Sequence, residues 1–147
     1  MKDNETVNFN LHDRAVFISG GAGDIGEVIV ETFLAQKSKV VIADLDGEKA
    51  EALAQKYGSK DVIACRMDLT NEESIQAAIE IAENHFSHID ILVNVAGILC
   101  RKSLFDTSQT DFEDSFGVNV TGLFLVSREA AKRMKNHGSG PLSISVP

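Results

Sequence analysis

The stretch SGGAGDIGE, residues 19–27, has the composition of a phosphate-binding turn. Glycines let the backbone turn sharply and let an anion come close to the main chain. A helix that starts directly after such a turn offers free N–H groups and the positive end of its dipole to the anion. The stretch therefore predicts a phosphate site, and an ordinary glycine-rich turn without a ligand is the alternative.

Two glycine spacings fit this stretch. Gly21, Gly23 and Gly26 match the general pattern G-x-G-x-x-G of dinucleotide-binding proteins. Gly20 and Gly26 instead match two of the three glycines of G-x-x-x-G-x-G, and Asp24 occupies the third glycine position. Both spacings place a phosphate at the turn, but they imply different enzymes.

A P-loop is not expected at this turn. Gly21 and Gly26 have the separation that a P-loop requires, but Glu27 stands where its phosphate-binding lysine is needed. A carboxylate at that point would repel the phosphates, so hydrolysis of a nucleoside triphosphate is not predicted.

Acids close the next two apolar runs of the sequence. Asp44 ends residues 39–46, where a carboxylate can accept hydrogen bonds from both hydroxyls of an adenosine ribose. Its charge would also repel a 2′-phosphate, so Asp44 favours NAD over NADP, and a solvated turn acid is the alternative. Asp46 is interpreted as part of the turn. Asp68 ends residues 61–68 and either accepts the adenine amine or caps the following helix.

Two asparagines follow later in the chain. Asn94 begins the segment Asn-Val-Ala-Gly, residues 94–97, whose small residues let a cofactor lie against the backbone, and its amide is predicted to tie neighbouring strands together. Asn119 shares its helical register with apolar neighbours, so we expect it to be buried. Burying an amide without a partner is costly. We therefore expect the Asn119 amide to have a hydrogen-bond partner, either the backbone at a local kink or a water molecule.

Other chemistry is not indicated. The four histidines show no metal-ligand spacing with the two cysteines, so no metal site is predicted. Cys100 follows the fourth apolar run, but a thiol nucleophile needs a base and a lowered pKa, and nothing in the sequence supplies either. Residues 129–137 are interpreted as the solvated basic end of a helix.

Short apolar runs alternate with helical periodicity along the chain. Runs that are apolar throughout are typical of strands buried on both faces of a parallel sheet, and right-handed crossovers then favour a doubly wound arrangement. We predict an α/β fold, a doubly wound (Rossmann-like) parallel sheet of five strands in the order 3-2-1-4-5. The strands are predicted at residues 14–20, 39–46, 61–68, 89–97 and 142–146.

Four helices are predicted between these strands. They start near Ile25, span about residues 50–57, follow a cap at Asn71, and run from Phe112 to Met134. The face of the first is predicted to be Ile25, Val28, Ile29 and Phe33. The face of the third is predicted to be Ile75, Ala78, Ile79, Ala82 and Phe86.

Length and charge limit the partners of the chain. Its 147 residues and formal net charge of −8 suit one domain with a core and disfavour nucleic acid or an anionic membrane as partner. No apolar run reaches the roughly 18 residues of a membrane span. The two cysteines are expected to be reduced thiols in the cytoplasm. We predict an N-terminal tail at residues 1–10 and one cofactor-binding domain at residues 11–147.

Five motifs in this order resemble those of the short-chain dehydrogenase/reductase family, single-domain type. The resemblance covers nearly the whole chain, from about Leu11 to Ser145. Residues 19–26 resemble its Thr-Gly-x-x-x-Gly-Ile-Gly, Asp44 its NAD-selecting acid, Asp68-Leu69 its Asp-Val, residues 94–97 its Asn-Asn-Ala-Gly, and residues 118–122 the helix segment with its catalytic Asn.

The resemblance implies a choice between the two glycine spacings. Gly20 and Gly26 are then the anchors of the turn, and Gly21 and Gly23 only fill it. Asp24 replaces the middle glycine of the family, where its charge should weaken pyrophosphate binding unless the side chain turns outward or caps the first helix. Val95 replaces an asparagine, and both departures are expected to be tolerated.

The resemblance also implies a cofactor, NAD rather than NADP, and a reaction. The reaction is that of an oxidoreductase acting on CH–OH groups, which interconverts a small alcohol and a carbonyl compound by hydride transfer. Members of the family usually form homo-oligomers through the long helix. The implied cofactor-binding residues are Gly20, Asp24, Ile25, Gly26, Asp44, Leu45, Asp68, Leu69, Asn94, Ala96 and Gly97.

The catalytic Ser, Tyr and Lys of the family have no counterparts in this sequence. Val146 stands at the Ser position, the sole tyrosine, Tyr57, lies in the second helical pattern, and no lysine follows Lys135. Asn119 is the one catalytic residue that remains. We therefore expect an incomplete fold and a C-terminally truncated member that at best binds NAD. A module that associates with itself or with a full-length relative, and a reading frame without function, are the alternatives.

Overall fold

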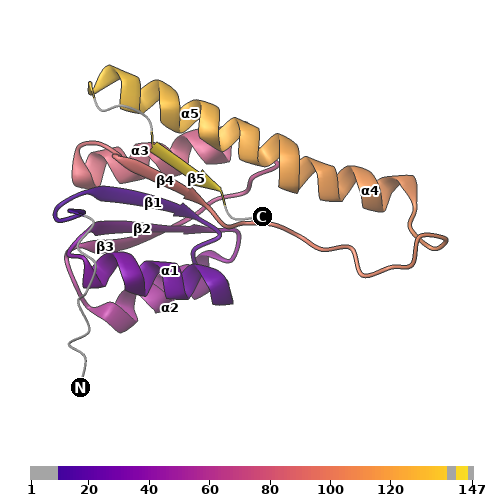
Figure 1. The fold of residues 1–147 in the computed structure, drawn as a ribbon, viewed down its shortest axis with the longest axis horizontal. Helices are drawn as coiled ribbons and strands as arrows, with labels where there is room; N and C mark the ends of the chain where they lie inside the picture. The colour runs from indigo at the N-terminus through magenta and orange to yellow at the C-terminus, as the bar shows by residue number, and fades with distance from the viewer. Residues whose placement is uncertain (1–9, 139–141, 146–147) are drawn as a thin grey trace.

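A computed structural model describes residues 10–138 and 142–145 of the chain, the last four by their backbone. The strands are Ala15–Ser19 (β1), Lys39–Asp44 (β2), Val62–Arg66 (β3), Ile91–Asn94 (β4) and Leu142–Ser145 (β5). The helices are Asp24–Ala35 (α1), Gly47–Tyr57 (α2), Glu72–Phe86 (α3), Gln109–Phe116 (α4) and Leu123–Asn136 (α5), with a π-helical segment, Gly117–Gly122 (η1), before α5. The sheet forms the middle layer, with α1 and α2 on one face and α3 and α5 on the other (Figure 1).

The five strands pair in the order β3-β2-β1-β4-β5, and every neighbouring pair is parallel. This confirms the predicted fold class and strand order. The strands are shorter than the predicted runs, because the backbone hydrogen bonds between neighbouring strands end before the runs do. The predicted tail up to residue 9, and Val146 of the fifth run, lie outside the described residues.

The central strands are buried on both faces, as their continuous apolar sequence predicts. In β1, Phe17 packs into the cluster shared with α3 and α5, whereas Val16 and Ile18 pack into the cluster shared with α1 and α2. Successive side chains of a strand point to opposite faces. One short run therefore supplies both halves of the core.

Helix α3 begins where the sequence predicts. The Asn71 side chain accepts a hydrogen bond from the backbone N–H of Ser74 at 3.0 Å, which caps the first turn. The predicted apolar face is confirmed, because all of its members are buried. These are Ile75, Ala78, Ile79, Ala82 and Phe86.

The predicted apolar face of α1 is wrong in part. Ile25 and Val28 are 59% and 60% exposed, whereas Val30 is fully buried. The other two predicted residues are half-buried. Gly26 sits against the carbonyl oxygen of Gly20 with no room for a side chain. This contact sets the rotation of the helix, so its buried stripe runs through Gly26 and Val30.

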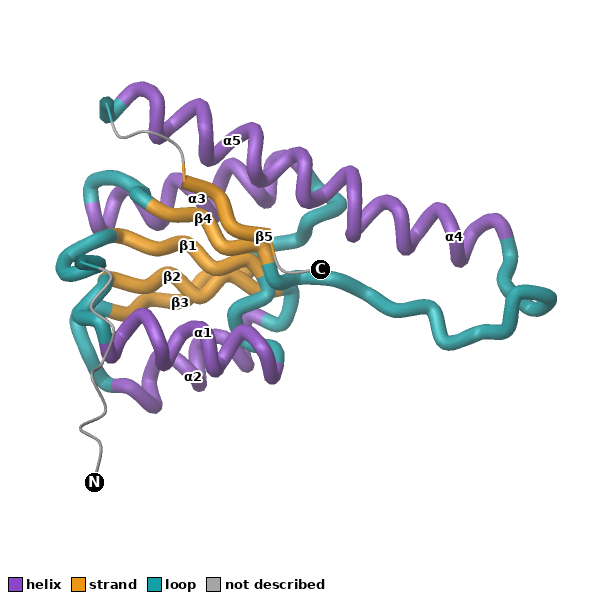
Figure 2. Tube along the Cα trace, in the orientation of Figure 1, coloured by secondary structure: helices purple, strands orange, loops and turns teal. Residues whose placement is uncertain are grey.

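The predicted long helix is a continuous rod made of α4, η1 and α5, and its α4 end projects beyond the sheet (Figure 1). The loop between β4 and α4, residues 95–108, extends in the same direction (Figure 2). Phe112, Phe116 and Phe124 are 63%, 50% and 60% exposed. Only the α5 part of the rod packs on α3 and β4.

The basic end of α5 is not simply solvated, contrary to the prediction. Glu129 is buried, and its carboxylate accepts a hydrogen bond from Arg133 Nε at 3.1 Å. Arg133 Nη1 also donates to Glu83 of α3 at 2.8 Å. The Glu129 and Glu83 carboxylates raise the pKa of Arg133. The charges at this end therefore join two helices, a role that residue composition alone does not reveal.

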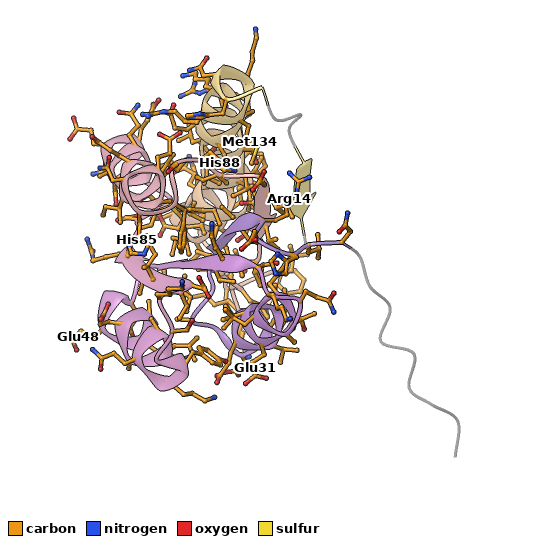
Figure 3. The ribbon with its side chains drawn as sticks, turned by 90° about the vertical axis from the view of Figure 1, so that its left-hand side faces the viewer. Arg14, Glu31, Glu48, His85, His88 and Met134 are labelled. Carbon is orange, nitrogen blue, oxygen red and sulfur yellow. The ribbon has the colours of Figure 1, made fainter. Side chains whose placement is uncertain are left out.

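Asp90 joins the starts of β1 and β4. Its carboxylate is buried and accepts hydrogen bonds from the N–H of Ala15 at 2.8 Å and from Arg14 Nη1 at 2.9 Å. His88 Nε2 lies 3.2 Å from the same carboxylate. Arg14 and His88 are labelled in Figure 3, which looks at this end of the molecule. The backbone N–H of Asp90 donates back to Ala15 O at 2.8 Å, so the contact is reciprocal.

We predict that Asp90→Ala lowers the free energy of unfolding by about 2 kcal/mol, because the buried N–H of Ala15 loses its acceptor. Urea denaturation followed by circular dichroism measures this change. Glu80→Ala removes an exposed carboxylate from α3 and should change the free energy by less than about 0.5 kcal/mol. Equal effects of the two substitutions would contradict the role of Asp90.

Candidate functional site

A cavity of about 830 Å³ opens at the carboxyl ends of the strands. This is the edge where open parallel sheets bind their ligands, at the point where the strand order reverses. The structure brings together at this cavity every residue of the implied cofactor-binding set except Asn94. The lining members of the set are Gly20, Asp24, Ile25, Gly26, Asp44, Leu45, Asp68, Leu69, Ala96 and Gly97.

Gly20 is the point where β1 comes closest to the chain beyond β4. It has a φ of +76°, and a Cβ placed on it would lie 2.5 Å from the backbone N and Cα of Ala96. Ser19 O accepts hydrogen bonds from the N–H groups of both Val95 and Ala96 at 2.9 Å, which holds the two segments together. Only glycine fits at this position.

The other glycines of the turn differ in how tightly they are packed. A Cβ on Gly26 would collide with Gly20 O and lie 2.7 Å from Gly21, whereas the nearest contact of a Cβ on Gly23 is at 3.5 Å. This geometry favours the spacing anchored at Gly20 and Gly26. Gly21 is more than a filler, because a Cβ there would lie 3.0 Å from the side chain of Ile42.

Helix α1 begins directly at the cavity. Its first bond of the i to i−4 type joins Glu27 N to Gly23 O at 2.8 Å, so the N–H groups of the three residues between them have no partner inside the helix. Gly23 is the N-cap, and Asp24 is the first helical residue. The alternative that Asp24 caps the helix is therefore wrong. Its exposed side chain leaves the backbone donors accessible to an anion.

Asp44 connects the end of β2 with the turn. Its Oδ2 accepts a hydrogen bond from Ala22 N at 3.0 Å, and its Oδ1 accepts one from Asp46 N at 3.1 Å. A carboxylate has about four lone-pair positions. Two of them are occupied by these backbone donors, and two are left for hydroxyl groups of a ligand in the cavity.

Asp68 is held inside its own turn. Its Oδ1 accepts hydrogen bonds from Thr70 Oγ1 at 2.7 Å and from Thr70 N at 2.9 Å. These bonds, the hydroxyl first, lower the pKa of Asp68 below its ordinary value. The cap of α3 is Asn71, so the alternative that Asp68 caps that helix is wrong. Asp68 presents a charged carboxylate at the cavity wall.

Asn94 lies beneath the cavity and is buried. Its amide nitrogen donates to Ser127 Oγ of α5 at 3.1 Å, so it ties β4 to a helix. The prediction that this amide ties neighbouring strands together is therefore wrong. Neither its Oδ1 nor the Oγ of the buried Ser19 has a hydrogen-bond partner among the described residues. Ser19 is also among the residues that line the cavity.

Asn119 is exposed, which contradicts the prediction that it is buried. It lies in η1, where the rod has left the sheet behind, so its helical register with apolar residues no longer implies burial. Its Oδ1 accepts a hydrogen bond from Ile98 N at 2.8 Å, and its Nδ2 donates to Ile98 O at 2.8 Å. Its partner is therefore the backbone of the loop that borders the cavity, not a water or its own helix.

Several residues line the cavity but lie outside the implied cofactor-binding set. Thr70 was detectable, since a hydroxyl two residues after Asp68 is typical of a tight turn. Arg101 and Val118 reach the cavity only because the loop after β4 and the rod pass beside it. The unpredicted lining residues are Ser19, Gly23, Ala43, Met67, Thr70, Val95, Ile98, Arg101 and Val118.

The remaining chemical side chains lie elsewhere. Within residues 10–138 and 142–145, no group of three or more His, Cys, Asp or Glu side chains is placed to hold a metal ion. Burial raises the pKa of the Cys65 thiol to about 12, which makes it a poor nucleophile at neutral pH. The hydroxyl of Tyr57 in α2 donates to Glu31 at 3.1 Å, away from the cavity.

Comparison with known proteins identifies the family. Residues 14–143 match the family model of the short chain dehydrogenases. The chain belongs to this family. A crystal structure of a 3-ketoacyl-(acyl-carrier-protein) reductase from Brucella melitensis, complexed with NADH, superimposes with a TM-score of 0.86 at 29% identity, over 92% of this chain and 57% of that one.

Two relatives show how far the similarity extends. An uncharacterized oxidoreductase of Bacillus subtilis is 38% identical over 137 residues, which is 90% of this chain and 20% of that protein. The secoisolariciresinol dehydrogenase of Forsythia intermedia is 33% identical over 132 residues, 88% of this chain and 48% of the relative. The chain thus spans about half or less of the length of these relatives. None of its described helices combines the length and apolar character needed to cross a membrane.

We predict that Gly20→Ala lowers the free energy of unfolding of the chain by about 3 kcal/mol, because the new Cβ meets the Ala96 backbone at a positive φ. Thermal and urea unfolding measure the loss. Gly23→Ala, in the same turn but without such contacts, should cost about 1 kcal/mol or less. If both variants were equally stable, Gly20 would not be an anchor.

Proposed function

We propose that this chain is the NAD-binding part of an oxidoreductase. The observation that carries the proposal is the cavity at the strand ends, where the tight glycine turn, the start of α1 and the Asp44 carboxylate meet. The backbone at Gly20 and Gly26 leaves no room for a Cβ, so the turn is tight. This turn and the free N–H groups at the start of α1 suit a pyrophosphate. We propose one cofactor domain that starts at about Leu11.

Each part of the dinucleotide has a proposed set of contacts. The pyrophosphate lies at the turn and at the N–H groups of Asp24, Ile25 and Gly26. The adenosine ribose bonds to Asp44, and the adenine lies between Asp68 and Leu69 on one side and the exposed side chains of Ile25 and Leu45 on the other. The remainder of the cofactor follows the backbone of Ala96 and Gly97, above Asn94.

Asp44 is proposed to select NAD over NADP. Its two unoccupied lone-pair positions match the two hydroxyls of the ribose. A 2′-phosphate in NADP would replace a hydroxyl donor with a negative charge beside the carboxylate, and like charges placed together are repelled.

The proposed reaction interconverts a small alcohol and a carbonyl compound in a longer form of the protein. Bound NAD supplies the hydride acceptor. Within this chain, Asn119 binds both backbone groups of Ile98 and so holds the loop at the cavity mouth. We propose that this contact positions the loop for catalysis.

The unpaired thiols of Cys65 and Cys100 support a reducing, cytoplasmic location.

Titration calorimetry tests cofactor choice. We predict that the chain binds NAD at least about tenfold more tightly than NADP, because of charge repulsion at Asp44. Asp44→Ser should weaken NAD binding. It should also reduce the difference between the affinities for NAD and NADP, because it removes the negative charge of the carboxylate. Equal affinity of the unsubstituted chain for both would refute the selection, and no binding of either would refute the function.

Self-association is a second candidate function, favoured by the exposed face of the rod. Phe112 and Phe116 lie side by side on α4, with ring centroids 6.0 Å apart, and Phe124 continues the face. Glu113 and Asp114 make α4 acidic, whereas α5 is rich in lysine and arginine. An antiparallel pair of rods from two copies would cover the apolar face and place opposite charges together. We propose a homodimer of this kind.

Analytical ultracentrifugation tests the homodimer. We predict a concentration-dependent dimer that Phe116→Ser weakens by about tenfold, because it removes a large apolar contact from the centre of the face. Added salt should also weaken the dimer, because it screens the paired charges. A single monomeric species at all concentrations would exclude this candidate.

A further inference from the structure

The glycine turn is attached to the end of β2 by three consecutive backbone N–H groups. Gly20 N and Gly21 N both donate to Ala43 O, at 2.7 and 3.3 Å, and Ala22 N donates to Asp44 Oδ2 at 3.0 Å. The first two bonds end on main chain, so a substitution of the Asp44 side chain does not remove their acceptor. The third ends on a side chain, so one substitution can remove it while leaving the rest of the turn unchanged.

Ala22 has no other means of satisfying this group. Ala22 is buried in the cluster between the sheet and α1, and Asp44 Oδ2 is the acceptor of its N–H. A buried donor without an acceptor is unfavourable. Without the Asp44 carboxylate, this N–H loses its acceptor and the segment from Ala22 to Gly23 loses the bond that fixes it to the end of β2. Gly23 N donates to Gly20 O at 3.3 Å, and an added Cβ on Gly23 would have no contact closer than 3.5 Å, so side-chain packing does not fix this residue.

This segment leads directly into the first turn of α1. Gly23 is the N-cap, and the next three residues carry the N–H groups that have no partner inside the helix. Their alignment depends on where Gly23 lies. A displaced turn has to be reordered when an anion binds, and the cost of that ordering is subtracted from the affinity.

From these contacts we infer that Asp44 is a positioning residue for the pyrophosphate site as well as a ribose ligand. Its carboxylate holds Ala22 so that the turn is already in its binding shape before the cofactor arrives. The binding of the ribose and the binding of the pyrophosphate therefore both depend on the Asp44 side chain. The inference rests on the proposed NAD site and goes beyond the choice between NAD and NADP.

Comparing the binding of adenosine with the binding of NAD distinguishes the two roles of Asp44. Adenosine contains the ribose but no phosphate, and NAD contains both. If Asp44 only binds the ribose, Asp44→Ala weakens adenosine and NAD by the same factor. If Asp44 also positions the turn, the variant weakens NAD by about tenfold more than adenosine. Titrations followed by NMR for adenosine and by calorimetry for NAD give the two factors.

Asp68→Ala is the matched control. It removes another carboxylate from the same cavity, but the Asp68 carboxylate accepts its hydrogen bonds from Thr70, within its own turn, and holds no part of the glycine turn. It should therefore weaken adenosine and NAD by equal factors. Equal factors for Asp44→Ala as well would overturn the positioning role, and so would a difference of the same size in Asp68→Ala.

Hydrogen exchange of the ligand-free chain provides a readout that does not depend on NAD binding. The Ala22 amide should exchange slowly in the unsubstituted chain and at least about tenfold faster in Asp44→Ala, while the Gly20 amide, bonded to Ala43 O, stays protected. Asp44→Asn keeps an acceptor oxygen and should restore protection of Ala22. Unchanged exchange of Ala22 in Asp44→Ala would overturn the inference, whereas failure of the unsubstituted chain to bind NAD would overturn only the proposed function.

Discussion

The contact between Gly20 and the backbone of Ala96 is the constraint on which the candidate site depends. Ser19 O binds the N–H groups of Val95 and Ala96, which draws the chain after β4 over the end of β1 and leaves no space for a side chain at Gly20. The turn then has to leave β1 at a positive φ and enter α1 at Gly26, itself pressed against Gly20 O. This part of the cavity wall is therefore made of main chain.

The charges around the cavity explain why main chain matters. Three acids, Asp24, Asp44 and Asp68, line the cavity, and Arg101 is the single basic side chain among its lining residues. In a chain with a net charge of −8, a dinucleotide anion gains little from side-chain cations. Backbone donors at the start of α1 have to supply the favourable electrostatics. Their alignment consequently has more influence on affinity than in a site rich in lysine and arginine.

The wall opposite the turn comes from the rod, and its geometry also depends on close backbone packing. A Cβ on Gly122 would lie 2.8 Å from Leu69, so η1 rests directly on the segment after β3. From there Asn119 reaches Ile98 with both polar atoms of its amide. The π-helical segment thus connects two loops that border the cavity, and a change in the rod would be transmitted to both.

Much of the fold was predictable because the signals are local. The central strands are buried on both faces, so their sequence is apolar at every position, and Asn71 marks the start of α3 with a side chain suited to capping. The rotation of α1 was not predictable in the same way. Its sequence allows an apolar face through Ile25 and Val28, but the contact at Gly26 turns that face toward solvent and buries Val30 instead.

The amino-acid sequence by itself determined which segments form the strands and that Asp44 and Asn94 stand at strand ends, because apolar runs act over short distances along the chain, whereas β3 ends at Arg66, before the predicted Asp68. Tertiary structure alone decided how polar groups are paired: Asp90 with Ala15, Arg133 with Glu83, Asn119 with Ile98 and Asp44 with Ala22. Each of these pairs joins segments that are 20 or more positions apart. A hydrogen bond needs its two atoms at a defined distance and direction, and only the packed sheet and helices bring such distant atoms to that geometry.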